Sequence, residues 1–174
     1  AVRERTPEVT LELLCSDLAG DYQALHSLLD GLELEVFAHN VECVPRLDSV
    51  VRDARASFEQ SIGILVEAKR LRPDILTKSS IMVGLGETDD EIIEALHLLR
   101  DANVDLVTIG QYLAPSPNHL AVDRFPEPAK YDEWTNYIEE IGFLGWACGP
   151  LVRSSYRAGD LLAKASARLR TYME

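Results

Sequence analysis

The segment KSSIMVGLGETDDE, residues 78–91, decides which fold the chain can adopt. Within it, the short apolar run at residues 81–83 meets two glycines, Gly84 and Gly86, and then an acidic segment that is typical of a helix start. This pattern predicts a buried parallel strand, a tight turn and a helix. In α/β folds such a junction lies at the carboxyl edge of the sheet, where ligands bind.

Outward from this segment, strand and helix patterns alternate along the whole chain. The apolar patterns predict strands at residues 9–14, 32–38, 75–83, 106–110 and 143–148. They predict helices at residues 22–30, 44–51, 58–71, 88–102, 131–141 and 160–172. Such alternation implies an α/β fold with a parallel sheet. Four or five units are too few to close an eight-stranded barrel, and an open doubly wound sheet also fits the count.

The composition restricts the class of protein and of partner. The chain has 174 residues, of which 47% are hydrophobic, so it can form one domain with a packed core. Its net charge of −12 argues against nucleic acid or a membrane as a partner, because both attract clustered Lys and Arg. The three cysteines are Cys15, Cys43 and Cys148. Their wide spacing indicates neither a disulfide framework nor a zinc site, and it favours a reducing compartment.

Polar residues follow four of the predicted strands. They are Asp17, the pair Asn40 and Glu42, residues 84–88, and the group Gln111, Tyr112 and Ser116. Because the carboxyl ends of parallel strands share one edge, we expect these residues to form one site. Each set also has an ordinary structural interpretation, since glycines form turns and acidic residues cap helices. Ser154 and Ser155 likewise fit a turn or a helix cap.

Four longer motifs carry a more specific signal. They are VFAHNVE (36–42), TKSSIMVGLGET (77–88), TIGQYLAPSPNHL (108–120) and GPLVRSSYRAG (149–159). Read together and in this order, they resemble lipoyl synthase, a radical S-adenosylmethionine (SAM) enzyme family. The likeness covers nearly the whole chain and points to the C-terminal part of such an enzyme.

The resemblance implies a fold and an activity. The fold is the C-terminal portion of a (β/α)6 radical SAM barrel, a partial barrel of parallel strands over residues 1–148. An RSSY segment and a helical extension follow over residues 149–174. The complete enzyme binds SAM and two [4Fe–4S] clusters, and inserts sulfur at C6 and C8 of a protein-bound octanoyl-lysine. One cluster, the auxiliary cluster, is the sulfur source.

The resemblance also implies roles for individual residues, which we carry over by position. Cofactor binding is expected from the polar and glycine residues of the first three motifs: Asn40, Glu42, Val83, Gly84, Gly86, Glu87, Gln111 and Tyr112. Either Ser154 or Ser155 is expected to give the auxiliary cluster an oxygen ligand. Arg153 is expected near the cluster or the substrate. No residue of the chain is expected to be catalytic in itself.

One departure from the family pattern limits these expectations. The family holds its clusters with a C-x3-C-x2-C set and a C-x4-C-x5-C set, and the 174 residues contain neither. Without three cysteines for each cluster, we expect the chain alone to bind no cofactor and to be inactive.

The expected partners follow from the same resemblance. They are an octanoylated lipoyl-carrier protein or domain, and either a separate N-terminal half or a second copy of the chain. The location is expected to be the cytoplasm, or the mitochondrial or plastid matrix in a eukaryote. The alternative function is a cluster-free binding or scaffold module. A further alternative is an unrelated α/β enzyme that binds phosphate at the turn of residues 84–86.

Overall fold

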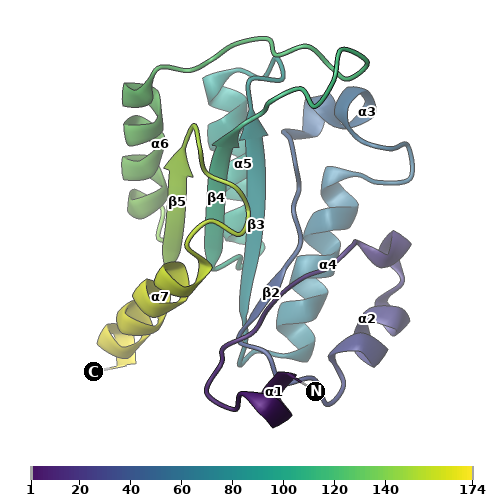
Figure 1. The fold of residues 1–174 in the computed structure, drawn as a ribbon, viewed down its shortest axis with the longest axis vertical. Helices are drawn as coiled ribbons and strands as arrows, with labels where there is room; N and C mark the ends of the chain where they lie inside the picture. Colours follow the sequence, from purple (N-terminus) through teal and green to yellow (C-terminus); the bar gives the residue numbers. More distant parts are fainter. Residues whose placement is uncertain (1, 174) are drawn as a thin grey trace.

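The computed structural model describes residues 2–173, and its centre is a parallel sheet of five strands (Figure 1). The strands are β1 (Glu12–Leu14), β2 (Val36–Ala38), β3 (Leu76–Val83), β4 (Leu106–Gln111) and β5 (Gly145–Gly149), and they pair in the order β1-β2-β3-β4-β5. A doubly wound sheet would reverse its strand order at a switch point. The sequential order observed here instead confirms the predicted partial barrel.

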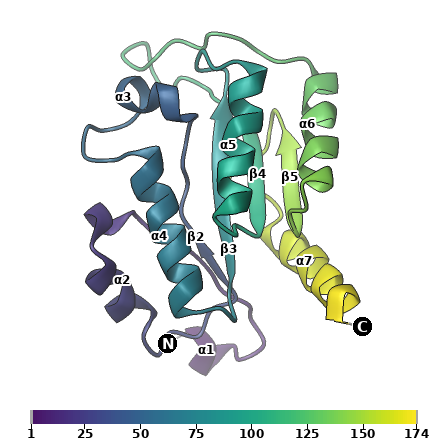
Figure 2. The ribbon, with the colours of Figure 1, turned by 180° about the vertical axis from the view of Figure 1, so that it is seen from behind.

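Helices cover one face of this sheet, as Figure 2 shows. They are α4 (Phe58–Leu71), α5 (Asp89–Asp101) and α6 (Pro128–Glu140), with α2 (Tyr22–Leu29) packed against α4. Short helical turns precede β1 and connect the later elements: α1 (Val2–Arg5), η1 (Leu18–Gly20), η2 (Pro45–Leu47) and α3 (Asp48–Val51). Among residues 2–173, none of the helices combines the length and the hydrophobicity that a bilayer crossing requires.

Alternate residues of each strand point to opposite faces, so the sheet has two different surfaces. On the face toward the helices, Val107 and Ile109 of β4 belong to the main apolar core. On the inner face, the amino-terminal ends of three strands form a smaller apolar cluster with Ala165: Val36, Leu76 and Leu106. Ala165 lies in α7 (Ala158–Met173), which therefore covers the lower part of the inner face (Figure 1).

The segment between β5 and α7 also crosses the inner face. A Cβ atom placed on Gly110 would lie only 2.2 Å from the carbonyl oxygen of Val152. The backbone at Val152 therefore rests directly on β4 at a position where no side chain larger than hydrogen fits.

The predicted element boundaries were mostly close. The helix at residues 58–71 was predicted correctly, because Ser57 Oγ accepts a hydrogen bond from the backbone of Gln60 and so marks its start. The predicted helix at 131–141 was wrong at its start, which lies at Pro128. Proline is tolerated in the first turn of a helix, where its missing N–H would have no partner anyway. The first two strands are shorter than predicted.

Candidate functional site

A cavity of about 380 Å³ opens at the carboxyl edge of β3 and β4, on the inner face of the sheet. We call this edge the rim. The cavity brings together six of the residues predicted from the sequence: Asn40, Glu42, Gln111, Tyr112, Arg153 and Ser154. They come from three separate motifs, which the fold places around one space. Met82, Leu113, Pro115 and Val152 add apolar walls.

Asn40 presents the clearest unused binding group in this cavity. Its Nδ2 donates to Glu42 Oε1 at 3.2 Å, whereas its Oδ1 is buried and has no hydrogen-bond partner. A buried acceptor without a partner costs free energy, and native proteins leave few of them. Because Oδ1 has almost no accessible surface, an N–H or O–H group of a ligand would reach it only after a small shift of the Asn40 side chain.

Glu42 is fixed next to Asn40 by the backbone of β3. Its N–H donates to Ser80 O at 3.1 Å, and its carbonyl accepts from Met82 N at 2.8 Å. Its φ of 68° lies in the left-handed region that non-glycine residues seldom adopt. Glu42 thus has a strained backbone conformation at a position where its carboxylate lines the cavity.

The floor below the cavity is polar and was missed by the sequence analysis. Thr108 Oγ1 donates to Ser80 Oγ at 2.8 Å, and deeper on the same face Lys78 Nζ donates to Glu12 Oε1 at 2.7 Å. Lys78 is buried, being 1% exposed. The available signal was the run of four polar residues, Thr77–Ser80, within a strand that was predicted to be buried, because such a run places polar side chains on both faces of the sheet.

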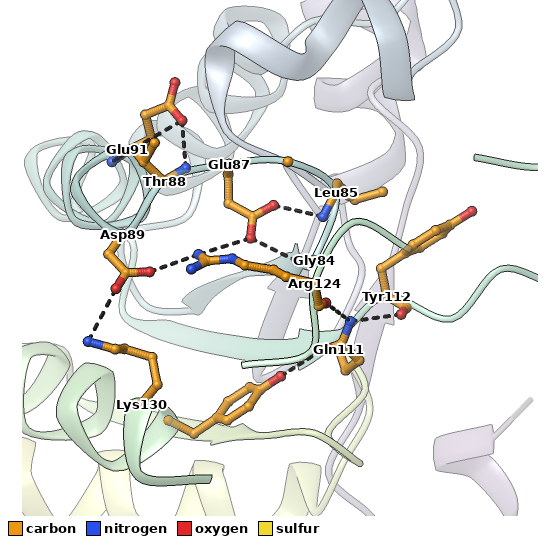
Figure 3. Close-up of polar contacts among 12 residues, drawn as sticks. Gly84, Leu85, Glu87, Thr88, Asp89, Glu91, Gln111, Tyr112, Arg124 and Lys130 are labelled. Atoms are coloured by element: carbon orange, nitrogen blue, oxygen red, sulfur yellow. Dashed lines mark hydrogen bonds and ion pairs between the residues drawn. The ribbon is translucent and has the colours of Figure 1, made fainter. Parts of the chain in front are cut away.

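Val83, Gly84, Gly86 and Glu87 do not line this cavity. Instead, Glu87 folds back over its own turn and accepts hydrogen bonds from the N–H groups of Gly84 and Leu85, both at 2.8 Å (Figure 3). The next turn is closed by a capping box between Thr88 and Glu91. The chain's own carboxylates thus occupy N–H groups that the phosphate-binding alternative would require.

Gln111 and Tyr112 contribute to the cavity with their polar atoms already engaged. Gln111 Nε2 donates to the carbonyls of Tyr112 and Arg124, and its Oε1 accepts from Tyr131 Oη at 3.1 Å. Burial raises the pKa of Tyr131 to about 12, so this hydroxyl remains a donor at neutral pH. Tyr112 Oη donates to Leu120 O at 3.0 Å. Both residues therefore act mainly as parts of the wall.

Of the two candidate cluster serines, Ser154 lines the cavity, whereas Ser155 is exposed and is not among its lining residues. Arg153 Nη1 donates to the carbonyl of Val152 at 2.7 Å. A second cavity, of about 410 Å³, lies between β5 and α7 and contains none of the predicted site residues.

The three cysteines, Cys15, Cys43 and Cys148, are free thiols. They lie in different parts of the chain, and burial raises the pKa of both Cys43 and Cys148 to about 12. Without a bound metal, these two thiols therefore stay protonated at neutral pH.

Comparison with known proteins identifies the family, although no family model matches the chain. The chain is 51% identical to the chloroplastic lipoyl synthase of Arabidopsis thaliana over 164 residues, which are 94% of the chain and 41% of that protein. It is 49% identical to the lipoyl synthase of Ectopseudomonas mendocina over 164 residues, 94% of the chain and 47% of the relative. It is 48% identical to the lipoyl synthase of Thermus thermophilus over 168 residues, which are 97% of the chain and 52% of that relative.

The chain thus spans about half the length of the curated relatives that it matches, and it matches them along nearly all of its own length. This coverage agrees with the order of the four motifs and with the partial barrel. The chain belongs to the lipoyl synthase family, at a length consistent with a C-terminal part of such an enzyme.

Proposed function

We propose that this chain supplies the SAM-facing wall of a lipoyl synthase, which inserts sulfur at C6 and C8 of a protein-bound octanoyl-lysine. The observation that carries the proposal is the rim cavity, where the unpartnered Oδ1 of Asn40 lies beside the carboxylate of Glu42. Its relatives that are named lipoyl synthase support this class of reaction.

The donor set of the cavity fits the chemistry of SAM. This ligand carries an ammonium group, an exocyclic amine and a sulfonium charge, so it offers both hydrogen-bond donors and positive charge. Asn40 Oδ1 supplies a free acceptor, and the Glu42 carboxylate favours a cation. Met82 and Pro115 supply an apolar surface. When bound, SAM supplies the radical chemistry that removes hydrogen atoms from the octanoyl chain.

Within this proposal, the chain's own residues bind and orient the ligand and exclude water. Asn40 and Glu42 hold the polar part of the ligand. Below them, the hydroxyl groups of Ser80 and Thr108 are paired by their own hydrogen bond. The segment at Val152 covers β4 and so narrows access of water from the inner face.

The two cysteine motifs that hold the clusters in this family do not occur in the 174 residues. In the complete enzyme, we propose that Ser154 or Ser155 gives the auxiliary cluster its oxygen ligand, with Arg153 nearby. Ser154 is the more favourably placed of the two because it lines the cavity. We expect the isolated chain to bind neither cluster.

Proposed partners are an octanoylated lipoyl-carrier protein and a chain, or a second copy, that completes the barrel. β1 and β5 are the two edges of the sheet, and edge strands pair readily with further strands. A scaffold that docks a carrier without catalysis remains the second candidate. The proposed location is the cytoplasm, or an organelle matrix such as the plastid named for the plant relatives.

The binding step can be tested on this chain combined with an N-terminal half that carries the six cluster cysteines, because the chain alone is expected to bind no cofactor. Isothermal titration calorimetry would measure the dissociation constant of SAM for the wild type, for Asn40→Ala and for Asn118→Ala. Asn118 is an exposed asparagine, so it provides a matched control. Loss of one hydrogen bond is expected to weaken binding about tenfold in Asn40→Ala only. Absence of SAM binding by the wild type, or equal weakening in both variants, would contradict the proposal.

A further inference from the structure

The wall of the rim cavity includes a segment without regular secondary structure. This segment, the rim loop, comprises residues 112–127 and connects β4 to α6 across the top of the sheet (Figure 1). Leu113 and Pro115 of the rim loop line the cavity. Because the loop has no helix or strand of its own, its position depends on contacts with its surroundings.

One residue of the rim loop, Arg124, makes contacts in two directions. Its Nη2 donates to Asp89 Oδ1 at 2.8 Å and lies 3.4 Å from Glu87 Oε1 (Figure 3). Its carbonyl oxygen accepts a hydrogen bond from Gln111 Nε2 at 3.1 Å. Arg124 thereby joins the loop to the start of α5 through its side chain and to the end of β4 through its backbone.

The charges at this junction make Arg124 difficult to replace. The side chain of Glu87 is 1% exposed, and a buried carboxylate needs both hydrogen bonds and an opposite charge. Burial alone would raise the pKa of Asp89, but hydrogen bonds from Arg124 and Lys130 outweigh that effect and lower it. Arg124 is therefore the cation that lies beside both carboxylates.

The glycine turn is shaped to receive this loop. Gly84 O accepts a hydrogen bond from Asp123 N at 2.9 Å. A Cβ on Gly84 would lie 2.3 Å from Gln111 Nε2 and 2.5 Å from Arg124 O. With its φ of 94°, Gly84 is required both by its backbone conformation and by the approach of the rim loop.

We propose that Arg124 is a positioning residue of the cavity. By attaching the rim loop to the turn at residues 84–87, it sets the place of Leu113 and Pro115 against a bound nucleoside. The turn at residues 84–87 does not line the cavity. It affects the cavity by holding the rim loop, which forms part of the cavity wall. The identity of the ligand rests on the proposed function, whereas the attachment of the loop does not.

The test compares Arg124→Gln with the matched control Lys130→Gln. Lys130 also pairs with Asp89, at 3.2 Å, and its side chain is 32% exposed against 33% for Arg124, but it belongs to α6. Hydrogen exchange would be measured at the Asp123 amide, with Ile109 in β4 as an internal reference, and SAM affinity by calorimetry on the chain combined with the N-terminal half. In Arg124→Gln, we expect the exchange rate at the Asp123 amide to rise about tenfold, and the dissociation constant of SAM to rise about tenfold as well. Both estimates follow from the strength of a charged hydrogen bond.

Lys130→Gln is expected to change either quantity less than about twofold, and Arg124→Lys to give intermediate values. Unchanged exchange at Asp123 in Arg124→Gln, or an equal rise in Lys130→Gln, would overturn the proposal. If the wild type binds no SAM, the proposed function fails, yet exchange at Asp123 still decides the role of Arg124. Should Arg124→Gln not fold, Asp89→Ala removes the acceptor of the 2.8 Å hydrogen bond, and a lack of faster exchange at Asp123 in that variant would also overturn the proposal.

Discussion

Replacing Gly110 by alanine gives a sharp test of how the segment after β5 lies on the sheet. The added Cβ would be 2.2 Å from Val152 O, whereas ordinary contacts begin at 3.4 Å. The obstacle is backbone, so no rotamer change can relieve it, and Val152 must retreat by about 1 Å. Such overpacking costs about 1–3 kcal/mol.

For a chain of this length, a loss of about 2 kcal/mol lowers Tm by about 4–8 °C. The matched control is Gly159→Ala in α7, where the new Cβ meets no atom within 4 Å. Because alanine favours helix over glycine, this control should gain up to about 1 kcal/mol. Differential scanning calorimetry would measure both values. Equal Tm for Gly110→Ala and the wild type would refute the close packing of Val152 on β4.

Two further predictions concern charged pairs. Hydrogen bonding from Arg46 lowers the pKa of Glu91 to about 2, so this carboxylate adds stability that is present above pH 4.5 and is lost as the pH falls toward 2. In urea unfolding, Glu91→Gln should therefore be less stable than the wild type at pH 7, and a difference that persists undiminished at pH 2 would contradict this. Lys78→Met should cost about 1–3 kcal/mol because it leaves the partly buried Glu12 carboxylate without its cation, and adding Glu12→Gln should recover part of the loss. If the double variant is no more stable than Lys78→Met alone, the pair is not coupled as described.

Much of the fold could be predicted because its boundaries are marked locally. Ser57 caps one helix, and the box formed by Thr88 and Glu91 caps another, so each start is visible within four residues of sequence. The rim was also predictable, since every parallel strand ends at the same edge. Asn40 and Gln111 meet there although they belong to different strand ends.

What sequence could not supply were contacts between distant segments. The expectation that residues 83–87 pass a ligand stays a prediction, but their pattern did not indicate that the backbone of Arg124 lies against Gly84. Nothing in the local pattern indicates a partner that lies 37 positions from Glu87. The ion pair of Lys78 with Glu12 was missed for the same reason, because it joins β3 to a strand 66 positions away.

The position of α7 has a consequence for the order in which the chain folds. Ala165 contacts Val36, Leu76 and Leu106, which are spread over most of the sequence before it. Contacts between such remote positions carry a large loop-closure entropy and form slowly. The helices outside the sheet pack mainly against neighbours along the chain, so they can form early. We therefore expect docking of α7 on the inner face to be a late step of folding, and before that step the apolar cluster of Val36, Leu76 and Leu106 is exposed to misassociation.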